Sequence, residues 1–179
     1  MNDVRLSKFL SLVLRHRPDE AGLTLDDHGW ADLAAVCEVA KNRFGATESD
    51  IRRIVSESDK QRFIIEGMQI RANQGHSVDV NLDLKPARPP ETLYHGTVQD
   101  ASASISAKGL VRGNRHHVHL SADSDTARRV AIRRNRPWLI YHIDAAAMTN
   151  SGHLFYCSVN GVWLTDHVPP EFLSTEEPE

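Results

Sequence analysis

The first third of the chain carries apolar residues at the spacing of amphipathic helices. They recur every three or four positions over residues 6–13, which predicts a first helix. That helix should end near Arg15–His16, because Pro18 disfavours helical backbone at the residue before it. A second helix is predicted over residues 32–41, and a third begins at a sequence resembling a capping box at 47–50.

Two short apolar stretches, 62–65 and 68–71, follow these helices, and Glu66-Gly67 between them predicts a hairpin turn. Three helices and a hairpin form the order of a winged helix-turn-helix, which often binds nucleic acid but also serves as an interaction module. Alternating apolar residues over 78–84 predict one more strand. Three prolines within 86–90 predict a stiff connector and a domain boundary.

The second half of the chain has the pattern of a strand-rich lobe. Strands are predicted over 92–97, 118–121 and 138–144, and helices over 101–108 and 124–134, with Ala127, Val130 and Ala131 facing inward. Two further strands, 155–158 and 162–165, flank Asn160-Gly161, a strong hairpin signal. The predicted fold class is therefore α+β, with an N-terminal lobe over 1–86, a linker over 87–90 and a C-terminal lobe over 91–179.

Composition narrows the class of protein without naming a function. The 179 residues are 40% hydrophobic and 25% charged, and the net charge is −3, so nucleic-acid binding would need a local basic patch. The N-terminus lacks the apolar core of a signal peptide, and no apolar run approaches the roughly 20 residues of a membrane span. Cys37 and Cys157 form no CxxC motif. These features predict a cytoplasmic protein with two free thiols and no membrane partner.

Arginines are the first candidates for chemistry. Arg15–His16 at a helix end and Arg62 at the start of a strand are, by spacing alone, equally typical of ordinary helix-terminal and surface residues. Between residues 128 and 136, five arginines occur with no acidic residue. Arginine recognises phosphate through a planar, permanently charged fork, so this cluster indicates either a phosphate-binding patch or a solvated helix face.

The histidines, and the absence of common nucleotide-binding and hydrolase motifs, limit which cofactor chemistry we expect. His117 and His119 share one strand face, but no third residue has the spacing of a metal ligand, so we expect no metal. The chain has no GxGxxG, GxxxxGK[ST] or GxSxG motif. A dinucleotide would therefore bind outside a Rossmann or P-loop frame.

Seven segments, taken in order, resemble the RNA 2′-phosphotransferase family, whose eukaryotic members finish tRNA splicing. They are Leu6-Ser7-Lys8-Phe9-Leu10-Ser11 running to Leu14-Arg15-His16-Arg17-Pro18; Gly29-Trp30; Lys60-Gln61-Arg62-Phe63; Arg71-Ala72-Asn73-Gln74-Gly75-His76-Ser77; Tyr94-His95-Gly96-Thr97; His117-Val118-His119-Leu120-Ser121; and Asn160-Gly161-Val162-Trp163-Leu164-Thr165.

The resemblance implies a fold and a reaction. The fold is a winged-helix RNA lobe joined to an ADP-ribosyltransferase-like lobe that binds NAD+ as co-substrate, without metal. In the first step an internal RNA 2′-phosphate attacks the nicotinamide ribose carbon and nicotinamide leaves. In the second, a ribose hydroxyl attacks the phosphorus, which frees 2′-OH RNA and ADP-ribose 1″,2″-cyclic phosphate. The expected partners are RNA bearing a 2′-phosphate and NAD+, and the expected protein is a monomer.

The resemblance also implies a catalytic set of Arg15, His16, Arg62 and a fourth arginine, for which Arg134 fits best and Arg133 and Arg136 are alternatives. Arginines can neutralise and orient a dianionic phosphate in a cleft that both lobes close. His16 can either bind the phosphate or protonate the departing RNA oxygen.

The remaining implied sites concern the two substrates. Residues expected to bind NAD+ come from three motifs: Tyr94, His95, Gly96, Thr97, His117, His119, Leu120, Ser121, Asn160 and Gly161. Gly96 would let the backbone approach the cofactor. Residues expected to bind the RNA or its phosphate form one loop: Asn73, Gln74, Gly75, His76 and Ser77.

Two other functions fit the same residues. One is an ADP-ribosyltransferase acting on terminal phosphates of nucleic acid or on protein, which would leave ADP-ribose attached to its acceptor. The other is a winged-helix regulator with a ligand-sensing lobe, which gives no reason for scattered arginines to converge.

Overall fold

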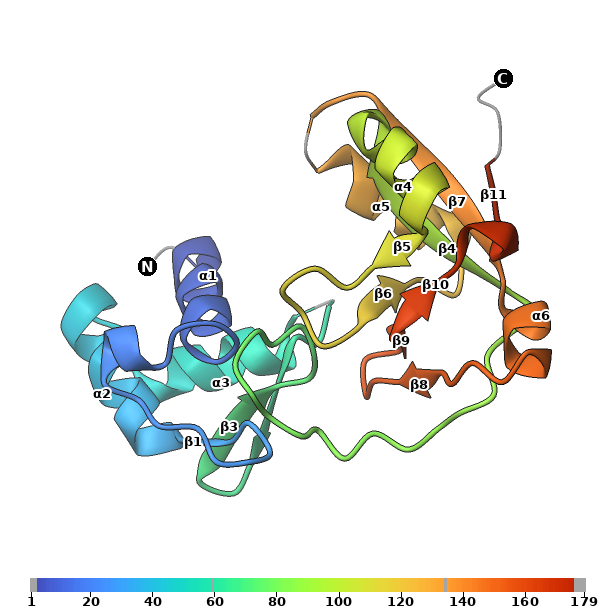
Figure 1. Ribbon diagram of the computed structural model, residues 1–179. Coiled ribbons are helices and arrows are strands. Elements are labelled where there is room, and N and C mark those ends of the chain that lie inside the picture. The colour runs from blue at the N-terminus through green and yellow to red at the C-terminus, as the bar shows by residue number, and fades with distance from the viewer. Residues whose placement is uncertain (1–2, 59, 134, 176–179) are drawn as a thin grey trace. The chain divides into compact units, whose positions relative to one another are not determined.

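A computed structural model describes residues 3–58, 60–133 and 135–175 of the chain. The chain divides into two compact units, Met1–Asp83 and Leu84–Glu179 (Figure 1). Each unit has its own apolar core. The helices and strands within each unit determine where the candidate side chains lie, so each unit is described by itself.

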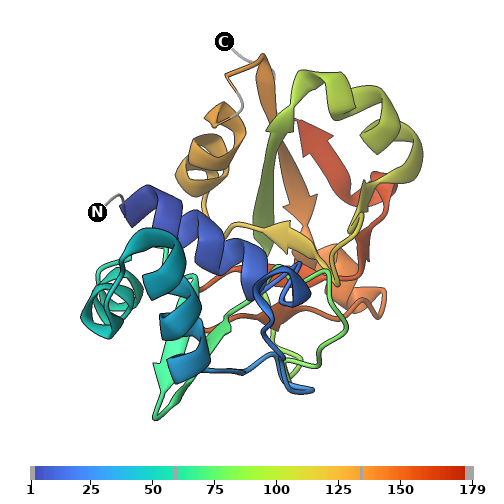
Figure 2. The same ribbon diagram turned by 90° about the vertical axis from the view of Figure 1, so that its left-hand side faces the viewer.

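The first unit is built on the three helices that periodicity predicts. They are α1 (Asp3–Val13), α2 (Leu33–Phe44) and α3 (Glu48–Ser56), with a short 3-10 turn, η1 (Asp19–Ala21), after α1. Figure 2 shows α1 and the other helices of this unit from the side. The Asp32 side chain caps α2 by accepting from the Ala35 amide, and Thr47 and Asp50 form the predicted capping box of α3.

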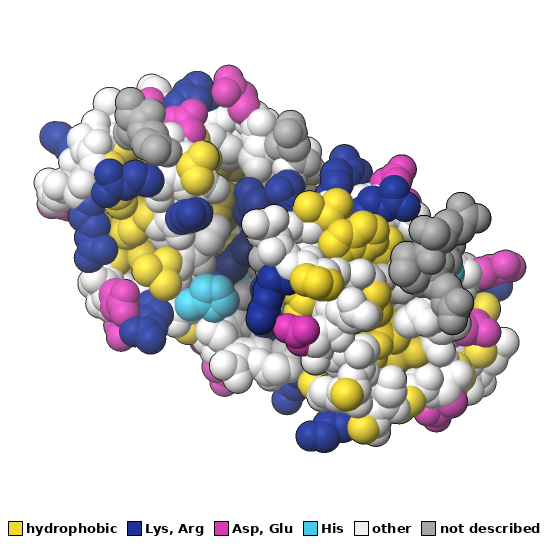
Figure 3. Space-filling view, turned by 90° about the horizontal axis from the view of Figure 1, so that it is seen from above, with side chains coloured by type: hydrophobic (Ala, Val, Ile, Leu, Met, Phe, Trp, Pro, Cys, Tyr) yellow, Lys and Arg dark blue, Asp and Glu magenta, His cyan; other side chains and the backbone are white. Residues whose placement is uncertain are grey.

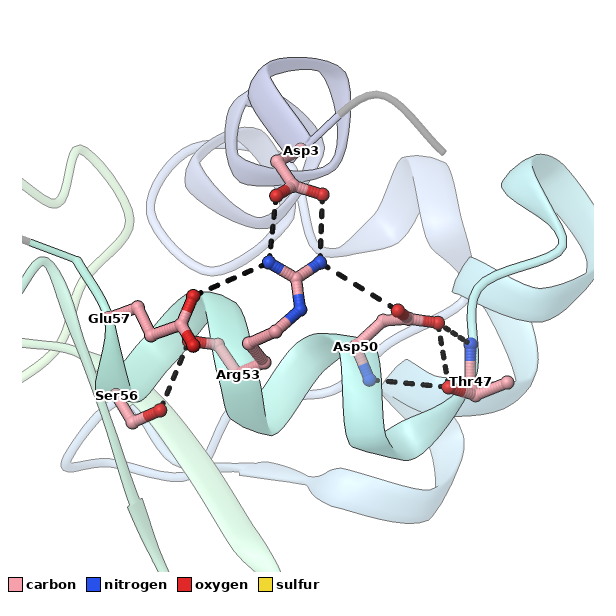
Figure 4. A network of polar contacts seen from close by, with 6 residues as sticks. All are labelled: Asp3, Thr47, Asp50, Arg53, Ser56 and Glu57. Carbon is pink, nitrogen blue, oxygen red and sulfur yellow. Dashed lines mark hydrogen bonds and ion pairs between the residues drawn. The ribbon is translucent and has the colours of Figure 1, made fainter.

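A network of ion pairs joins the start of α1 to α3 (Figure 4). Arg53 donates to both carboxylate oxygens of Asp3, at 2.8 and 3.0 Å, and also lies near Asp50 and Glu57. The hydrogen bond from Arg53 holds the pKa of the Asp3 carboxyl below its ordinary value. Because these side chains are solvent-accessible, the network orients the two helices more than it stabilises them.

The sheet of the first unit is antiparallel and three-stranded, in the order β1 (Ala31–Asp32), β3 (Gln69–Ala72), β2 (Phe63–Glu66). Glu66 pairs with Gln69, so Gly67 and Met68 make the hairpin turn, and Gly67 has φ +57°. The predicted hairpin is confirmed, with its turn one residue further along. Its inward residues join those of the helices in one apolar core.

The strand predicted over 78–84 is wrong. That segment is irregular, because its backbone hydrogen bonds go to loops and a helix end rather than to a ladder. The amides of Ser77 and Val78 both donate to the Arg15 carbonyl, and the amide of Asn81 donates to the Asp27 carbonyl. Asp83 has φ +52°, which no regular strand accommodates. Val80 is buried, so the apolar pattern reflects the burial of a side chain in a segment whose backbone pairs with none of the described strands.

The proline-rich segment lies against the second unit. Pro86 bridges to Tyr156, and the Ala87 amide donates to the Phe155 carbonyl at 2.8 Å. The division between the units falls between Asp83 and Leu84, a few residues before the linker predicted at 87–90. The whole predicted connector thus belongs to the second unit.

The main sheet of the second unit has the order β11 (Leu173–Thr175), β7 (Trp138–Asp144), β4 (Thr92–Val98), all antiparallel. Helix α5 (Ser124–Ile132) packs on one face of β4 and β7, and α4 (Ser102–Lys108), which follows η2 (Gln99–Ala101), lies on the other side (Figures 1 and 2). Ala127 and Ala131 face inward as predicted, but Val130 is 40% exposed, so its predicted burial is wrong.

Two small sheets complete this unit. One has the order β6 (Val118–Leu120), β9 (Trp163–Thr165), β8 (Tyr156–Cys157), and the other pairs β5 (Leu110–Val111) with β10 (His167–Val168). The predicted hairpin around Asn160-Gly161 is confirmed by the β8–β9 pairing. Helix α6 (Ala145–Asn150) and the turn η3 (Pro170–Phe172) were not predicted. Cys37 and Cys157 are free thiols, as predicted.

Candidate functional site

Arg15 and His16 lie on the last turn after α1. Helical hydrogen bonding continues past Val13, with the amide of Leu14 donating to the Leu10 carbonyl and that of His16 donating to the Leu12 carbonyl. This turn places both side chains at one end of the helix. The Arg15 carbonyl accepts the amides of the 77–78 segment, which brings a distant loop against the same turn.

Arg62 lies beside Arg15 although the two are 47 positions apart. The Arg15 guanidinium donates to the Arg62 carbonyl at 3.4 Å and lies 5.7 Å from the centre of the Phe63 ring, at cation–π distance. The Arg62 carbonyl also accepts the Asn73 amide at 2.9 Å. The side-chain amide of Asn73 donates to the Gln61 carbonyl. Asn73 thus holds the turn from which the Arg62 side chain projects.

Gln61 adopts a strained conformation immediately before Arg62. Its φ of +37° lies in the left-handed region that side chains other than glycine rarely adopt, at a cost of about 1–3 kcal/mol. Its amide donates to the Ser58 carbonyl at 2.8 Å, and its carbonyl receives the Asn73 side chain. The strain is held by hydrogen bonds on both sides, which fix the course of the chain into β2.

Within the 73–77 loop, the members differ in exposure. Asn73, Gln74 and His76 are 6%, 8% and 1% exposed, so their side chains build the loop from inside. Ser77 is exposed, and its hydroxyl lies 2.9 Å from His16 Nδ1. Ser77 is therefore the member of this loop that directly orients a predicted catalytic side chain.

The first unit thus brings together three of the four predicted catalytic residues. Arg15 and His16 come from the end of a helix, and Arg62 comes from the start of a strand. The 73–77 loop hydrogen-bonds to both of these segments. Two arginines and a histidine, all able to donate hydrogen bonds to an anion, suit the binding of a phosphate. Arg134, the predicted fourth member, lies outside the described residues.

Three other arginines of the 128–136 cluster have separate contacts. Arg128 lies over the Trp138 ring at 5.8 Å, Arg129 donates to the Thr126 hydroxyl, and Arg136 pairs with Asp100 at 3.1 Å. Basic side chains elsewhere are also interspersed with acidic ones on the molecular face drawn in Figure 3. The global charge therefore gives no broad basic field, and anion binding depends on local geometry.

A second polar cluster forms where β4 meets the end of β6. The backbones of Tyr94 and Ser121 exchange two hydrogen bonds, at 2.9 and 2.8 Å. His95 Nδ1 lies 2.9 Å from the His119 carbonyl. The Tyr94 and His142 rings meet edge to face at 4.9 Å, since the two residues are opposite each other in the β4–β7 register. His142 was not among the residues predicted to bind the cofactor.

The tautomer of His95 follows from its hydrogen bond. A carbonyl can only accept, so Nδ1 carries the proton and Nε2 is an acceptor. Burial lowers the pKa of His95, the hydrogen bond to His119 opposes that shift, and the Arg115 charge adds to it. His95 is therefore neutral at pH 7 and presents an acceptor nitrogen.

Gly96 and Leu120 have structural reasons for their positions. A Cβ on Gly96 would lie 1.9 Å from the Ala127 carbonyl oxygen of α5, so the glycine is required by helix packing. This corrects the expectation that the missing side chain leaves space for a cofactor. Leu120 is 2% exposed and belongs to the core of the second unit. Thr97 is partly buried on β4 opposite Leu139.

His117 and the Asn160-Gly161 turn lie along the β8–β9 hairpin. The His117 ring is 5.4 Å from Tyr156, and its Nε2 is 3.7 Å from an Asp166 carboxylate oxygen. Ser158 holds the turn through its hydroxyl, which lies 2.8 Å from the Asn160 side-chain oxygen. Gly161 has φ +76°, and no atom lies near its missing Cβ, so this glycine serves the turn conformation.

Over residues 3–58, 60–133 and 135–175, no group of three His, Cys, Asp or Glu side chains is placed to hold a metal ion. In the same ranges, no helix combines the length and the apolar character that crossing a membrane requires.

The fold is that of a two-unit protein of mixed helices and strands. The group formed by Arg15, His16 and Arg62 in its first unit is a cationic site suited to phosphate. Comparison with known proteins makes this specific. Residues 1–167 match the model of the family described as RNA 2′-phosphotransferase, Tpt1 / KptA family. The chain therefore belongs to the RNA 2′-phosphotransferase family.

Individual relatives agree over almost their whole length. A probable RNA 2′-phosphotransferase of Rhizobium rhizogenes is 48% identical over 169 residues, which cover 94% of this chain and 91% of the relative. One of Trichormus variabilis is 49% identical over 175 residues, covering 95% and 94%. One of Streptomyces coelicolor is 48% identical over 176 residues, covering 98% and 96%.

Proposed function

We propose that this protein removes an internal 2′-phosphate from RNA and transfers it to NAD+ in two steps. The observation that carries the proposal is that the Arg15 guanidinium lies against the Arg62 backbone, while the next residue, His16, is held by Ser77. In the first step, an oxygen of the RNA 2′-phosphate bonds to the nicotinamide ribose carbon and nicotinamide departs. In the second, the adjacent ribose hydroxyl attacks phosphorus, loses its proton, and the RNA oxygen leaves as a 2′-hydroxyl.

Arg15 and Arg62 supply charge in both steps. A phosphate dianion needs neutralisation before it can be held as an oriented nucleophile, and paired guanidinium groups provide this in a fixed geometry. In the second step, negative charge builds on the phosphoryl oxygens, and the same groups stabilise it without reorganising. The contact of Arg15 with the Phe63 ring and the Arg62 carbonyl limits the freedom of its side chain.

His16 acts on the leaving oxygen of the second step in this proposal. Its ring is oriented by Ser77 at 2.9 Å, and an imidazole so placed can donate a proton to a departing oxygen. The departing RNA 2′-oxygen needs one proton, and the attacking hydroxyl releases one, so the step is balanced overall. Arg134 remains the proposed fourth cationic member.

The polar cluster of the second unit has groups that fit NAD+ as co-substrate. A neutral His95 offers Nε2 as an acceptor for a ribose hydroxyl. The Tyr94 ring, packed edge to face on His142, offers an apolar surface on the other face of β4. The backbone groups of Tyr94 and Ser121 are occupied by each other, so binding would rely on side chains. Bound NAD+ would supply an electrophilic ribose carbon and a nicotinamide leaving group.

The test is a single incubation with two readouts. Purified protein is incubated with NAD+ and an oligoribonucleotide that carries one internal 2′-phosphate. Nicotinamide and RNA with a free 2′-hydroxyl should form in equal amounts, and no inorganic phosphate should be released. Omitting NAD+ should abolish both products. ADP-ribose that stays attached to the RNA would instead indicate a transferase that stops after the first step, and absence of both products would refute the proposal.

Two variants test the role of the cationic site. Arg15→Ala and Arg62→Ala should each lower kcat by at least about 100-fold, the loss typical of removing a group that stabilises transition-state charge. Arg52→Ala is the matched control, because Arg52 is an exposed arginine on α3 that pairs with Glu48. Near-normal rates for either site variant would refute the assignment, provided that its circular dichroism matches that of the parent protein.

A further inference from the structure

A groove in the first unit runs between α1 and α3, and the reaction proposed above uses Arg62 alone of the residues that line it. Its volume is about 600 Å³, within the range of sites that hold small molecules. Six of its ten described lining residues carry a hydroxyl or a cationic group: Ser7, Lys8, Ser11, Arg53, Ser58 and Arg62. Arg62 belongs both to this groove and to the candidate phosphate site, so the groove begins where the reaction is proposed to occur.

The groove follows from the helical spacing of α1. One face of this helix packs on the core, with Leu6, Leu10 and Val13 fully buried. Ser7, Lys8 and Ser11 occupy another face and line the groove together. Core packing explains the apolar half of this segment and gives no reason for the polar half.

Charge along the groove is uneven. At the N-terminal end of α1, Asp3 and Glu57 line the groove, but both are engaged by Arg53. Further along the helix lie Lys8 and Arg62. Within the described part of the chain, no carboxylate lies within ion-pair distance of Lys8. The end of the groove that leads to the reaction site therefore favours an anion.

The shape of the groove favours a chain over a compact ion. Asp3 and Ser11 both line it, and eight residues of α-helix span about 12 Å. Val4 is 63% exposed at its edge and offers an apolar surface to a sugar or base. A cationic groove with an apolar edge is the usual form of a track for single-stranded nucleic acid.

We propose that this groove holds the RNA strand next to the nucleotide that carries the 2′-phosphate, and that Lys8 contacts a phosphodiester of that strand. The inference rests on the proposed function, because it takes the reacting phosphate to lie at Arg62. The Ser7 and Ser58 hydroxyls of the groove can donate to the same backbone, whereas the Ser11 hydroxyl donates to the Ser7 carbonyl at 2.9 Å. Lys8 then contributes to RNA affinity and not to the chemical steps.

Binding is tested without catalysis, by fluorescence anisotropy of a labelled, single-stranded oligoribonucleotide that has no 2′-phosphate. Each phosphate contact adds about 0.7 to the dependence of log affinity on log salt concentration for single strands. Raising salt from 50 to 200 mM should therefore weaken wild-type binding about 2.6-fold more than Lys8→Ala binding. Lys8→Arg should keep the wild-type slope. Lys41→Ala, which removes an exposed lysine on α2, should also keep it.

Turnover gives the second readout. With a 2′-phosphorylated oligoribonucleotide extended on both sides, Lys8→Ala should raise the KM for RNA several-fold and leave kcat and the KM for NAD+ unchanged. With a 2′-phosphorylated dinucleotide, which cannot occupy the groove beyond the reacting site, the variant should match the wild type. An equal effect on both substrates, or an unchanged salt slope, would overturn the inference. Wild-type protein that binds RNA with the expected slope but releases no nicotinamide would refute only the proposed function.

Discussion

Replacing Gly96 by alanine should damage the second unit through one steric contact. The added Cβ would lie 1.9 Å from the Ala127 carbonyl oxygen and 3.1 Å from the Ala131 Cβ. Ordinary contact begins at 3.4 Å, so α5 and β4 must separate by about 1.5 Å. The obstacle is helix backbone, which cannot rotate away as a side chain can. Overpacking costs about 1–3 kcal/mol, and we expect the upper end of that range or more.

The assay is urea unfolding followed by tryptophan fluorescence. Trp138 and Trp163 lie in the second unit and Trp30 in the first, so a Trp30→Phe background reports on the second unit alone. Gly96→Ala should lower the free energy of unfolding by at least about 3 kcal/mol. Displacement of β4 should also lower kcat/KM for NAD+ about 100-fold, the cost of a misplacement near 1 Å.

The control separates steric overlap from backbone conformation. Gly113 has φ +60° and no atom within 4 Å of its missing Cβ, so Gly113→Ala should cost only the roughly 1–2 kcal/mol of a left-handed alanine. If Gly96→Ala stays within about 0.5 kcal/mol of the parent, or if the two variants lose the same stability, the packing explanation is refuted.

Three other predictions follow from contacts described above. Asn73→Ala should lower the free energy of unfolding by about 1–3 kcal/mol, because the buried Asn73 side-chain amide holds the strained Gln61 turn. It should also lower kcat, since that turn precedes Arg62. Urea unfolding measures the first effect and single-turnover rates the second. Thr47→Ala should cost about 1 kcal/mol by removing the capping box of α3, measured by thermal unfolding. His95 has a lowered folded-state pKa, so its contribution to stability is present above pH 6.5 and lost as pH falls below that value; His95→Gln should flatten this dependence in unfolding experiments from pH 7.5 to 5.

Each of these predictions can fail in a distinct way. Wild-type turnover in Asn73→Ala would show that Gln61 keeps its conformation without the amide. Thr24→Ala, on an exposed threonine outside any helix, is the control for Thr47→Ala, and equal losses would exclude a capping effect. A parallel pH dependence in His95→Gln and wild type would assign the titration to another group, such as His117, whose pKa burial also lowers.

Local sequence patterns predicted most of the longer helices and strands, but they predicted the segments between them less well. Helical periodicity and capping residues located α1, α2 and α3, since both signals act within a few residues. The alternation over 78–84 has the same form as a strand pattern, yet its backbone bonds to the Arg15 carbonyl and to a loop. Helix α6 was missed, although Asp144 caps it through the Ala147 amide, because the pattern before it continues the strand β7.

By itself, the sequence located helices α1, α2 and α3 and the two hairpins, and its ordered motifs indicated the family that the comparisons show. Spacing alone left Arg15, His16 and Arg62 as ordinary surface residues. Only the tertiary structure brought Arg15 to Arg62 across 47 positions and His16 to Ser77 across 61. The physical reason is that these approaches depend on backbone hydrogen bonds between a helix end, a strand start and a distant loop. The same holds for Gly96, where the need for glycine arises from a helix carbonyl 31 positions away in the chain.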